Sequence, residues 1–303
     1  MSKRHITGPL RVTYQIKPLT AGLYFVATPI GNARDITLRA LDVLASADVL
    51  AAEDTRTLRK LMEIHGIPLE GRHIIAYHDQ NGAKARPRLL GLLEAGKSVA
   101  YASEAGTPLV ADPGFVLSRE ALAAGYAVTS APGPSAMIAA LTIAGLPSDR
   151  FLFAGFPPAS KGARRTFFTE WGGIQATLGF YESPKRIYRT LSELCDIYGP
   201  TRVVAVCREL TKRFEEVISG PIGEVMEALE GRTIKGEIVL LVDRPSKLSS
   251  EDIDLDAELD KALATLSVKD AAAQIAAEFG LKKREVYQRA LERGQKDVRD
   301  EDE

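Results

Sequence analysis

The sequence is poor in the residues that form disulfide frameworks and metal centres. Its 303 residues include two cysteines and four histidines. Cys195 and Cys207 do not form a CxxC pair, and both lie in apolar patterns typical of buried small side chains. The histidines lack the spacing of metal ligands. We therefore expect neither a disulfide framework nor a metal site.

Long apolar runs and a strong net charge are also missing. The run at residues 238–242 is far too short to span a bilayer, and residues 1–21 mix basic and polar side chains where a signal peptide has an apolar core. With 45% apolar residues the chain can bury a full core. We expect a cytoplasmic protein without membrane association. Because the net charge is −1, any binding of nucleic acid must depend on local clusters.

The most informative motif is SEAGTPLVADPG at residues 103–114, which directly follows an apolar segment. Its glycines and prolines end a strand with backbone suited to contact a ligand. Loops of this kind repeat along the first half, and they are TPIGN, EDTR, YHDQN, SEAGTP and APGPSA. The strands that precede them are predicted at residues 22–28, 48–52, 74–77, 97–102 and 127–130. Because parallel strands carry ligands at their carboxyl ends, we expect these loops to converge on one cleft.

The second half is predicted to be a mixed α/β domain. Its strands are expected at residues 151–155, 176–181, 202–207, 215–219 and 236–243, with a helix near 223–230. We divide the chain into an N-terminal extension (1–21), an N-terminal α/β domain (22–147), a C-terminal α/β domain (148–243), a solvated linker (244–266), a helix-turn-helix-like unit (267–294) and a disordered acidic tail (295–303).

Basic side chains follow the predicted strands of the second half. Such clusters either contact phosphates or form a solvated helix face. The candidates for RNA contact are Lys161, Arg164, Arg165, Lys185 and Arg186.

The unit at residues 267–294 combines an alanine-rich helix with a basic one, on which Lys282, Lys283 and Arg284 lie. This hairpin predicts either contact with RNA or a packing or dimer element.

Several motifs together resemble the ribosomal RNA small subunit methyltransferase I family of the tetrapyrrole methylase superfamily. They are residues 22–56, SEAGTPLVADPG, APGPSA, FYESPKR, CRELTK and KGEIVLLV. The resemblance implies two α/β domains with a ligand cleft between them, S-adenosylmethionine as methyl donor, and a homodimer. It also implies transfer to the ribose 2′-hydroxyl of a cytidine in the decoding centre of 16S rRNA. One departure is Glu104, where the family usually has Asp.

The resemblance also implies which residues hold the donor. On the side of the first domain they are Pro29, Gly31, Ser103, Ala105, Gly106, Thr107, Val110, Ser135 and Ala136. On the side of the second domain they are Tyr181, Cys207, Arg208, Gly236, Glu237 and Ile238. No GxGxxG follows the first strand, and a donor without a pyrophosphate needs none. We expect a β-branched residue at Gly106 to occupy ligand space and to leave the fold intact.

A ribose hydroxyl is a weak nucleophile unless its proton is removed or its developing charge is stabilised. The candidates are Asp54, Glu182 and Lys212, with Asp54 as the leading base. Asp54 is equally suited to cap the helix that begins near Thr55.

Other side chains of these loops fit an RNA substrate. Arg34 and Arg56 would grip phosphates. Tyr77 and Tyr181 would stack on an extruded cytosine, or else pack as half-buried residues.

Two other functions remain open at this point. A methylase of tetrapyrroles or other small molecules would use the same donor without the basic third unit. A non-catalytic nucleic-acid binder would recognise its partner through the helical hairpin and use the α/β body to sense a ligand.

Overall fold

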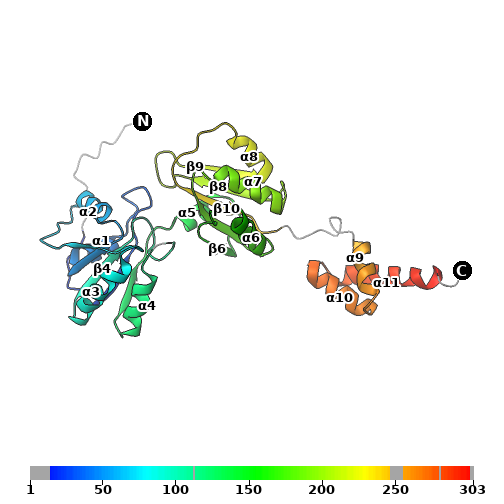
Figure 1. Ribbon diagram of the computed structural model, residues 1–303, viewed down its shortest axis with the longest axis horizontal. Helices are drawn as coiled ribbons and strands as arrows, with labels where there is room; N and C mark the ends of the chain where they lie inside the picture. Colours follow the sequence, from blue (N-terminus) through cyan, green and yellow to red (C-terminus); the bar gives the residue numbers. More distant parts are fainter. Residues whose placement is uncertain (1–13, 112, 246–254, 280, 301–303) are drawn as a thin grey trace, which may run out of the picture. The chain divides into compact units, whose positions relative to one another are not determined.

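The computed structural model describes residues 14–111, 113–245, 255–279 and 281–300 (Figure 1). The chain forms two compact units, Met1–Arg244 and Pro245–Glu303. No described helix has the length and apolar character needed to cross a membrane.

The first sheet is parallel and has the strand order β3-β2-β4-β1-β5. Its strands are β1 (Gly22–Val26), β2 (Val49–Ala52), β3 (Ile74–Ala76), β4 (Ser98–Ala102) and β5 (Val128–Ala131). All five lie where the sequence predicts them. Both faces are covered, which explains why the strands read as short apolar runs without alternation.

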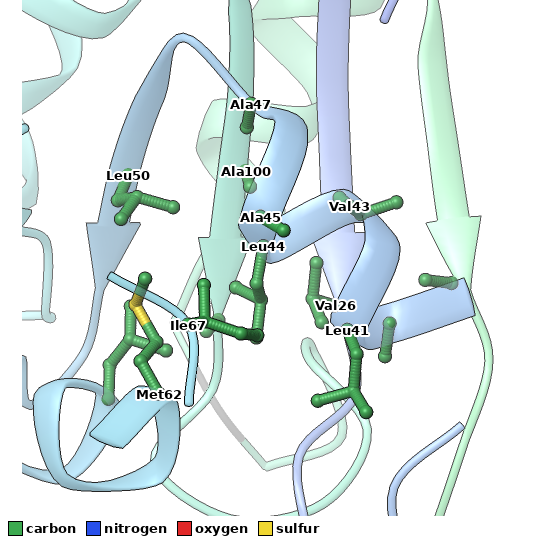
Figure 2. Packing of buried hydrophobic residues seen from close by; sticks show 14 of the residues in the cluster. Val26, Leu41, Val43, Leu44, Ala45, Ala47, Leu50, Met62, Ile67 and Ala100 are labelled. Atoms are coloured by element: carbon green, nitrogen blue, oxygen red, sulfur yellow. The ribbon is translucent and has the colours of Figure 1, made fainter. Parts of the chain in front are cut away.

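Helices α1 (Leu38–Ser46) and α2 (Thr55–Ile64) pack on one face of this sheet, and α3 (Gly82–Glu94) and α4 (Phe115–Ala123) pack on the other. Figure 2 shows Leu41 and Leu44 of α1 directed toward the strands. Thr37 fixes the start of α1, because its side chain accepts a hydrogen bond from the Ala40 amide.

The second sheet has the order β6-β7-β10-β8-β9, and only β6 and β7 are parallel neighbours. Its strands, also at the predicted places, are β6 (Phe151–Phe153), β7 (Thr177–Glu182), β8 (Val203–Arg208), β9 (Glu216–Pro221) and β10 (Ile238–Val242). Helices α6 (Lys161–Trp171), α7 (Ile187–Tyr198) and α8 (Ile222–Leu229) bury one face.

Helix α5 (Ala136–Ile143) follows the first sheet but packs on the free face of the second. Met137 lies against β7 at Gly179, where a Cβ atom would be 2.2 Å from the Met137 sulfur. Ile30, from the loop after β1, joins the same buried cluster. A helix and a loop that follow strands of the first sheet therefore take part in the core on this face of the second sheet.

The second unit consists of α9 (Leu255–Leu263), α10 (Val268–Phe279) and α11 (Lys283–Asp300). Their shared core includes Leu259, Ala271, Ile275 and Val286. Ser267 caps α10, because its hydroxyl accepts a hydrogen bond from the Asp270 amide. The predicted helical hairpin is thus present in α10 and α11.

Two expectations about this unit are wrong. The stretch 244–266 contains α9 where a linker was expected, and α11 continues to Asp300 through most of the expected acidic tail, whose last residues, 301–303, lie outside the described residues. The acidic side chains of α9 looked solvated in the sequence, but Asp256 pairs with Arg289 and Asp260 pairs with Arg293.

A buried ion pair joins α6 to α7. Arg164 is fully buried, and its guanidinium donates to both carboxylate oxygens of Glu193 at 2.7 and 2.6 Å. The guanidinium also donates to the Pro158 and Ala159 carbonyls. The prediction that Arg164 contacts RNA is wrong, because no part of the residue is exposed.

We predict that Glu193→Ala lowers the free energy of unfolding by about 3–5 kcal/mol, because it leaves the Arg164 charge buried and unpaired. Urea unfolding of the variant and the wild type measures the difference. The double variant Arg164→Met, Glu193→Leu should recover much of the loss, since it removes both charges. Equal stability of Glu193→Ala and wild type would contradict the prediction.

Candidate functional site

The site lies where the loops after β1 and β4 meet. These strands are neighbours, and the helices that follow them, α1 and α4, go to opposite faces of the sheet. Such a switch point leaves a crevice at the carboxyl ends of the strands. The two loops are joined backbone to backbone, because Thr28 and Gly106 exchange hydrogen bonds of 2.9 and 3.0 Å.

A cavity of about 450 Å³ opens at this point and is lined by residues of both sheets. Its volume is typical of small-molecule sites, which occupy about 300–1,000 Å³. The cavity brings together these residues of the predicted donor site: Ala105, Gly106, Thr107, Val110, Ser135, Ala136, Tyr181, Gly236, Glu237 and Ile238.

The remaining predicted donor residues lie beside the described lining. Pro29 and Gly31 belong to the loop that packs on residues 210–212, and the Ser103 hydroxyl donates to the Gly106 carbonyl. Arg208 pairs with Glu216. The Cys207 side chain is fully buried in the core beneath α5, and burial raises its pKa to about 12. The prediction of a donor contact by Cys207 is therefore wrong for its side chain.

The backbone conformation at position 106 requires a glycine. Its φ of +84° lies in the left-handed region, and an added Cβ would meet Ile30 at 3.2 Å. The expectation that a β-branched residue here leaves the fold intact is wrong, since the side chain would strain the loop and press on the core.

Four carboxylates line the cavity, from Glu53, Glu104, Glu182 and Glu237. Burial raises the pKa of Glu104, and the negative charges of Glu53, Asp54 and Glu237 raise it further. The Glu104 amide donates to the Glu53 carboxylate at 3.2 Å, which holds the two loops together. Glu53 was missed in the sequence, although its position directly after β2 was a usable signal.

Asp54 caps α2, and the structure favours that alternative over a role as base. Its carboxylate accepts hydrogen bonds from the Arg56 and Thr57 amides and pairs with the Arg56 guanidinium at 2.8 Å. These hydrogen bonds, the Arg56 side chain first, lower the pKa of Asp54 to about 2. Asp54 is therefore a weak base, and it does not belong to the described cavity lining. For both reasons it is poorly suited to remove a proton from a hydroxyl.

Glu182 is buried and engaged on several sides. It accepts hydrogen bonds of 2.7 Å from the Ser183 amide and the Thr190 hydroxyl, and it lies 3.2 Å from the Arg186 guanidinium. These contacts position the loop after β7 at the cavity rim.

Lys212 bridges two carboxylates. Its amine donates to Glu209 at 2.9 Å and to Glu237 at 3.0 Å. Burial lowers the pKa of Lys212, but these two hydrogen bonds and charges outweigh it, so that the pKa is raised and the amine stays cationic. The adjacent Gly31 lies so close that a Cβ would be 2.5 Å from the Lys212 side chain. Lys212 thus ties the loop after β8 to the cavity-lining Glu237.

The other predicted RNA contacts differ in exposure. Arg34, Arg56, Lys161, Lys185, Lys282, Lys283 and Arg284 are exposed. Arg165 pairs with Asp196, and Arg186 donates to the Pro157 and Pro158 carbonyls. Tyr77 is only 2% exposed, so the alternative of a packing residue holds for it.

Comparisons with known proteins agree with this architecture. The family model "Tetrapyrrole (Corrin/Porphyrin) Methylases" matches residues 22–226, and "RsmI C-terminal HTH domain" matches residues 249–294. The solved structure of the methyltransferase CobJ has a TM-score of 0.58 and 18% identity, covering 76% of this chain and 96% of that one. A uroporphyrin-III-C-methyltransferase from Thermus thermophilus has a TM-score of 0.52 and 20% identity, covering 74% of this chain and 94% of that one.

Curated relatives are more similar in sequence. Ribosomal RNA small subunit methyltransferase I of Mesorhizobium japonicum is 45% identical, over 91% of this chain and 93% of its own length. The protein of the same name from Escherichia coli O157:H7 is 43% identical, over 89% of this chain and 94% of its own length.

The family model over residues 22–226 shows that the chain is a member of the tetrapyrrole methylase class, and the solved structures share its fold. Within that class, the chain belongs to the ribosomal RNA small subunit methyltransferase I family.

We predict that Ala105→Leu weakens the binding of S-adenosylmethionine by about tenfold or more, because the larger side chain enters the cavity. Ala105 is exposed, so the change should leave the thermal unfolding temperature unchanged. Titration calorimetry measures the affinity, with Ala123→Leu on the exposed surface of α4 as the matched control. Wild-type affinity in a folded Ala105→Leu protein would exclude this cavity as the donor site.

Proposed function

We propose that this chain transfers a methyl group from S-adenosylmethionine to the ribose 2′-hydroxyl of a cytidine in the 16S rRNA decoding centre. The observation that carries the proposal is a single cavity, lined by strand-end loops of both sheets, in a chain of this family. We include in the proposal a homodimer located in the cytoplasm.

The cavity lining fits such a donor. Small side chains at Ala105 and Ala136 and the bare backbone of Gly106 leave room for a flat purine. The carboxylates of Glu53, Glu104 and Glu237 supply negative charge suited to a sulfonium cation. When bound, the donor supplies an electrophilic methyl group. The residues of this chain contribute by orienting it and by holding the hydroxyl in line with it.

Exposed cations of the first unit suit an RNA acceptor. Arg56 lies at the start of α2, and its side chain is 90% exposed beside the cavity carboxylates. Arg34 follows the loop after β1, while Lys161 and Lys185 follow two strands of the second sheet. Such side chains bind phosphates and so position a nucleic acid without reading its sequence.

The proton acceptor in this proposal is Glu104. Its carboxylate lines the cavity, and burial together with the charges of Glu53, Asp54 and Glu237 raises its pKa above the usual value, which makes it a stronger base than an ordinary Glu. Asp54, Glu182 and Lys212 are held in ion pairs instead. Lys212 and Glu182 then act as positioning residues for the walls of the site.

The test is methyl transfer from tritiated S-adenosylmethionine to small ribosomal subunits from a strain that lacks this activity. Methylation at one cytidine 2′-oxygen, mapped by mass spectrometry of nuclease fragments, would support the proposal. A methyl group on a base, or transfer only to free tetrapyrroles, would contradict it.

We predict that the rate of transfer falls at acidic pH as Glu104 becomes protonated, because only its anion accepts the proton. Glu53→Gln removes a negative neighbour and therefore lowers the pKa of Glu104. The acidic limb of the pH profile of kcat should move to lower pH in this variant. Glu104→Gln should lower kcat by about 10²–10⁴-fold, whereas Glu104→Asp should retain activity. An unchanged acidic limb in Glu53→Gln, or full activity of Glu104→Gln, would refute the assignment.

The C-terminal unit is proposed to contact RNA through α10 and α11. Asp256 and Asp260 pair with Arg289 and Arg293. Lys282, Lys283 and Arg284 form its exposed basic cluster, in which Lys282 pairs with the exposed Glu285. We predict that the triple variant Lys282→Glu, Lys283→Glu, Arg284→Glu binds the small subunit more weakly. The slope of log binding constant against log salt concentration should become shallower by about 0.7–0.9 for each lost phosphate contact. Donor affinity and the oligomeric mass should not change. Wild-type salt dependence in this triple variant would favour a packing or dimer role.

A further inference from the structure

Phe156 is an exposed aromatic side chain at the edge of the cavity. It follows β6, its side chain is 58% exposed, and it is part of the cavity lining. Its ring contacts Tyr181 edge to face, with centroids 5.5 Å apart, and Tyr181 in turn packs on Phe153. An exposed aromatic ring that packs on a second ring and lines a cavity can receive a flat ligand.

The loop that carries Phe156 is fixed by several hydrogen bonds to its backbone. Its next three carbonyls, those of Pro157, Pro158 and Ala159, accept hydrogen bonds from the guanidinium groups of Arg164 and Arg186. Arg164 is anchored by the buried Glu193, and Arg186 pairs with the buried Glu182. A loop fixed by two such arginines presents its aromatic ring at little cost in conformational entropy.

The surroundings of the ring favour an RNA base over the purine of the donor. The loop residues 182–184 line the cavity next to it, and exposed Lys185 follows directly in the chain. On the other side along the chain, exposed Lys161 begins α6. An exposed aromatic ring on a loop that leads to exposed cations combines the two kinds of group with which proteins hold an extruded base and its phosphates.

We propose that Phe156 is the stacking platform for the target cytosine, held rigid by Arg164 and Arg186. The base would stack on the open face of the ring, which brings the attached ribose to the cavity. This inference rests on the proposed function, since it assigns a binding residue to the same RNA substrate. The sequence also offers Tyr77 and Tyr181 for this role, but Tyr77 is buried and Tyr181 lies against the Phe156 ring.

The test compares Phe156→Ala, Phe156→Leu and Phe156→Trp in the full-length protein. Because stacking needs a flat ring, Ala and Leu should lower kcat/KM for small ribosomal subunits by roughly ten- to a hundredfold, and Trp should restore it. The affinity for S-adenosylmethionine, measured by calorimetry, should stay within about twofold of the wild type. Phe214→Ala is the matched control, because Phe214 is 63% exposed and lies outside the described cavity lining.

Each other outcome overturns the inference in a recognisable way. A parallel loss of donor affinity in Phe156→Ala would place the ring against the donor. A change in molar mass by light scattering would make Phe156 a contact between copies. Wild-type kcat/KM in Phe156→Leu would leave the ring without a role in RNA binding. If the wild-type protein methylates no ribose in the subunit, the proposed function is wrong, and the role of Phe156 as a stacking platform, which rests on that function, is wrong as well.

Discussion

The packing of α5 on the second sheet determines the geometry of the site. Met137 fills the space left by Gly179, and Ile30 from the loop after β1 enters the same core. Because protein cores are densely packed, this contact fixes α5 and the loop after β1 against the second sheet. The loops after β1 and β4 are thereby held opposite the loops of the second sheet, and one cavity forms from both halves. A donor and an acceptor that must be aligned for an in-line displacement need such a fixed frame.

Several charged side chains around this frame are held by hydrogen bonds and ion pairs. Lys212 joins Glu209 to the cavity-lining Glu237, Asp54 caps α2, and Arg164 and Glu193 brace the loop after β6. Each of these groups is already engaged in hydrogen bonds or an ion pair, so it is poorly suited to exchange a proton during a reaction. Glu104 differs, because burial and neighbouring carboxylates disfavour its charged form. A cationic partner lowers the pKa of a carboxylate, so the carboxylates of the site differ in pKa according to which of them have such a partner.

The sequence predicted most of the fold, because short apolar runs separated by polar or turn residues mark the strands, and the parallel first sheet gathers its strand ends at one edge. The family resemblance indicated Ala105, Gly106 and Thr107 as donor residues, and all three line the cavity. The sequence did not predict the burial of Arg164, which depends on a carboxylate on another helix, at Glu193. It also misread α9 as a linker, since the partners of Asp256 and Asp260 lie far along the chain. Local patterns indicate elements and loops, whereas pairing between distant charges becomes visible only in the folded chain.

The central claim is that one cavity, shared by both sheets, holds the donor. A crystal structure of the chain with S-adenosylhomocysteine tests it most directly. We expect the ligand to contact Ala105, Gly106, Thr107 and Val110 in the loop after β4 and residues 236–238 at the start of β10, with its sulfur near the cavity-lining carboxylates, Glu104 among them. A ligand bound elsewhere, such as in the hollow beside β3 lined by His73 and Arg88, or against one sheet alone, would contradict the account.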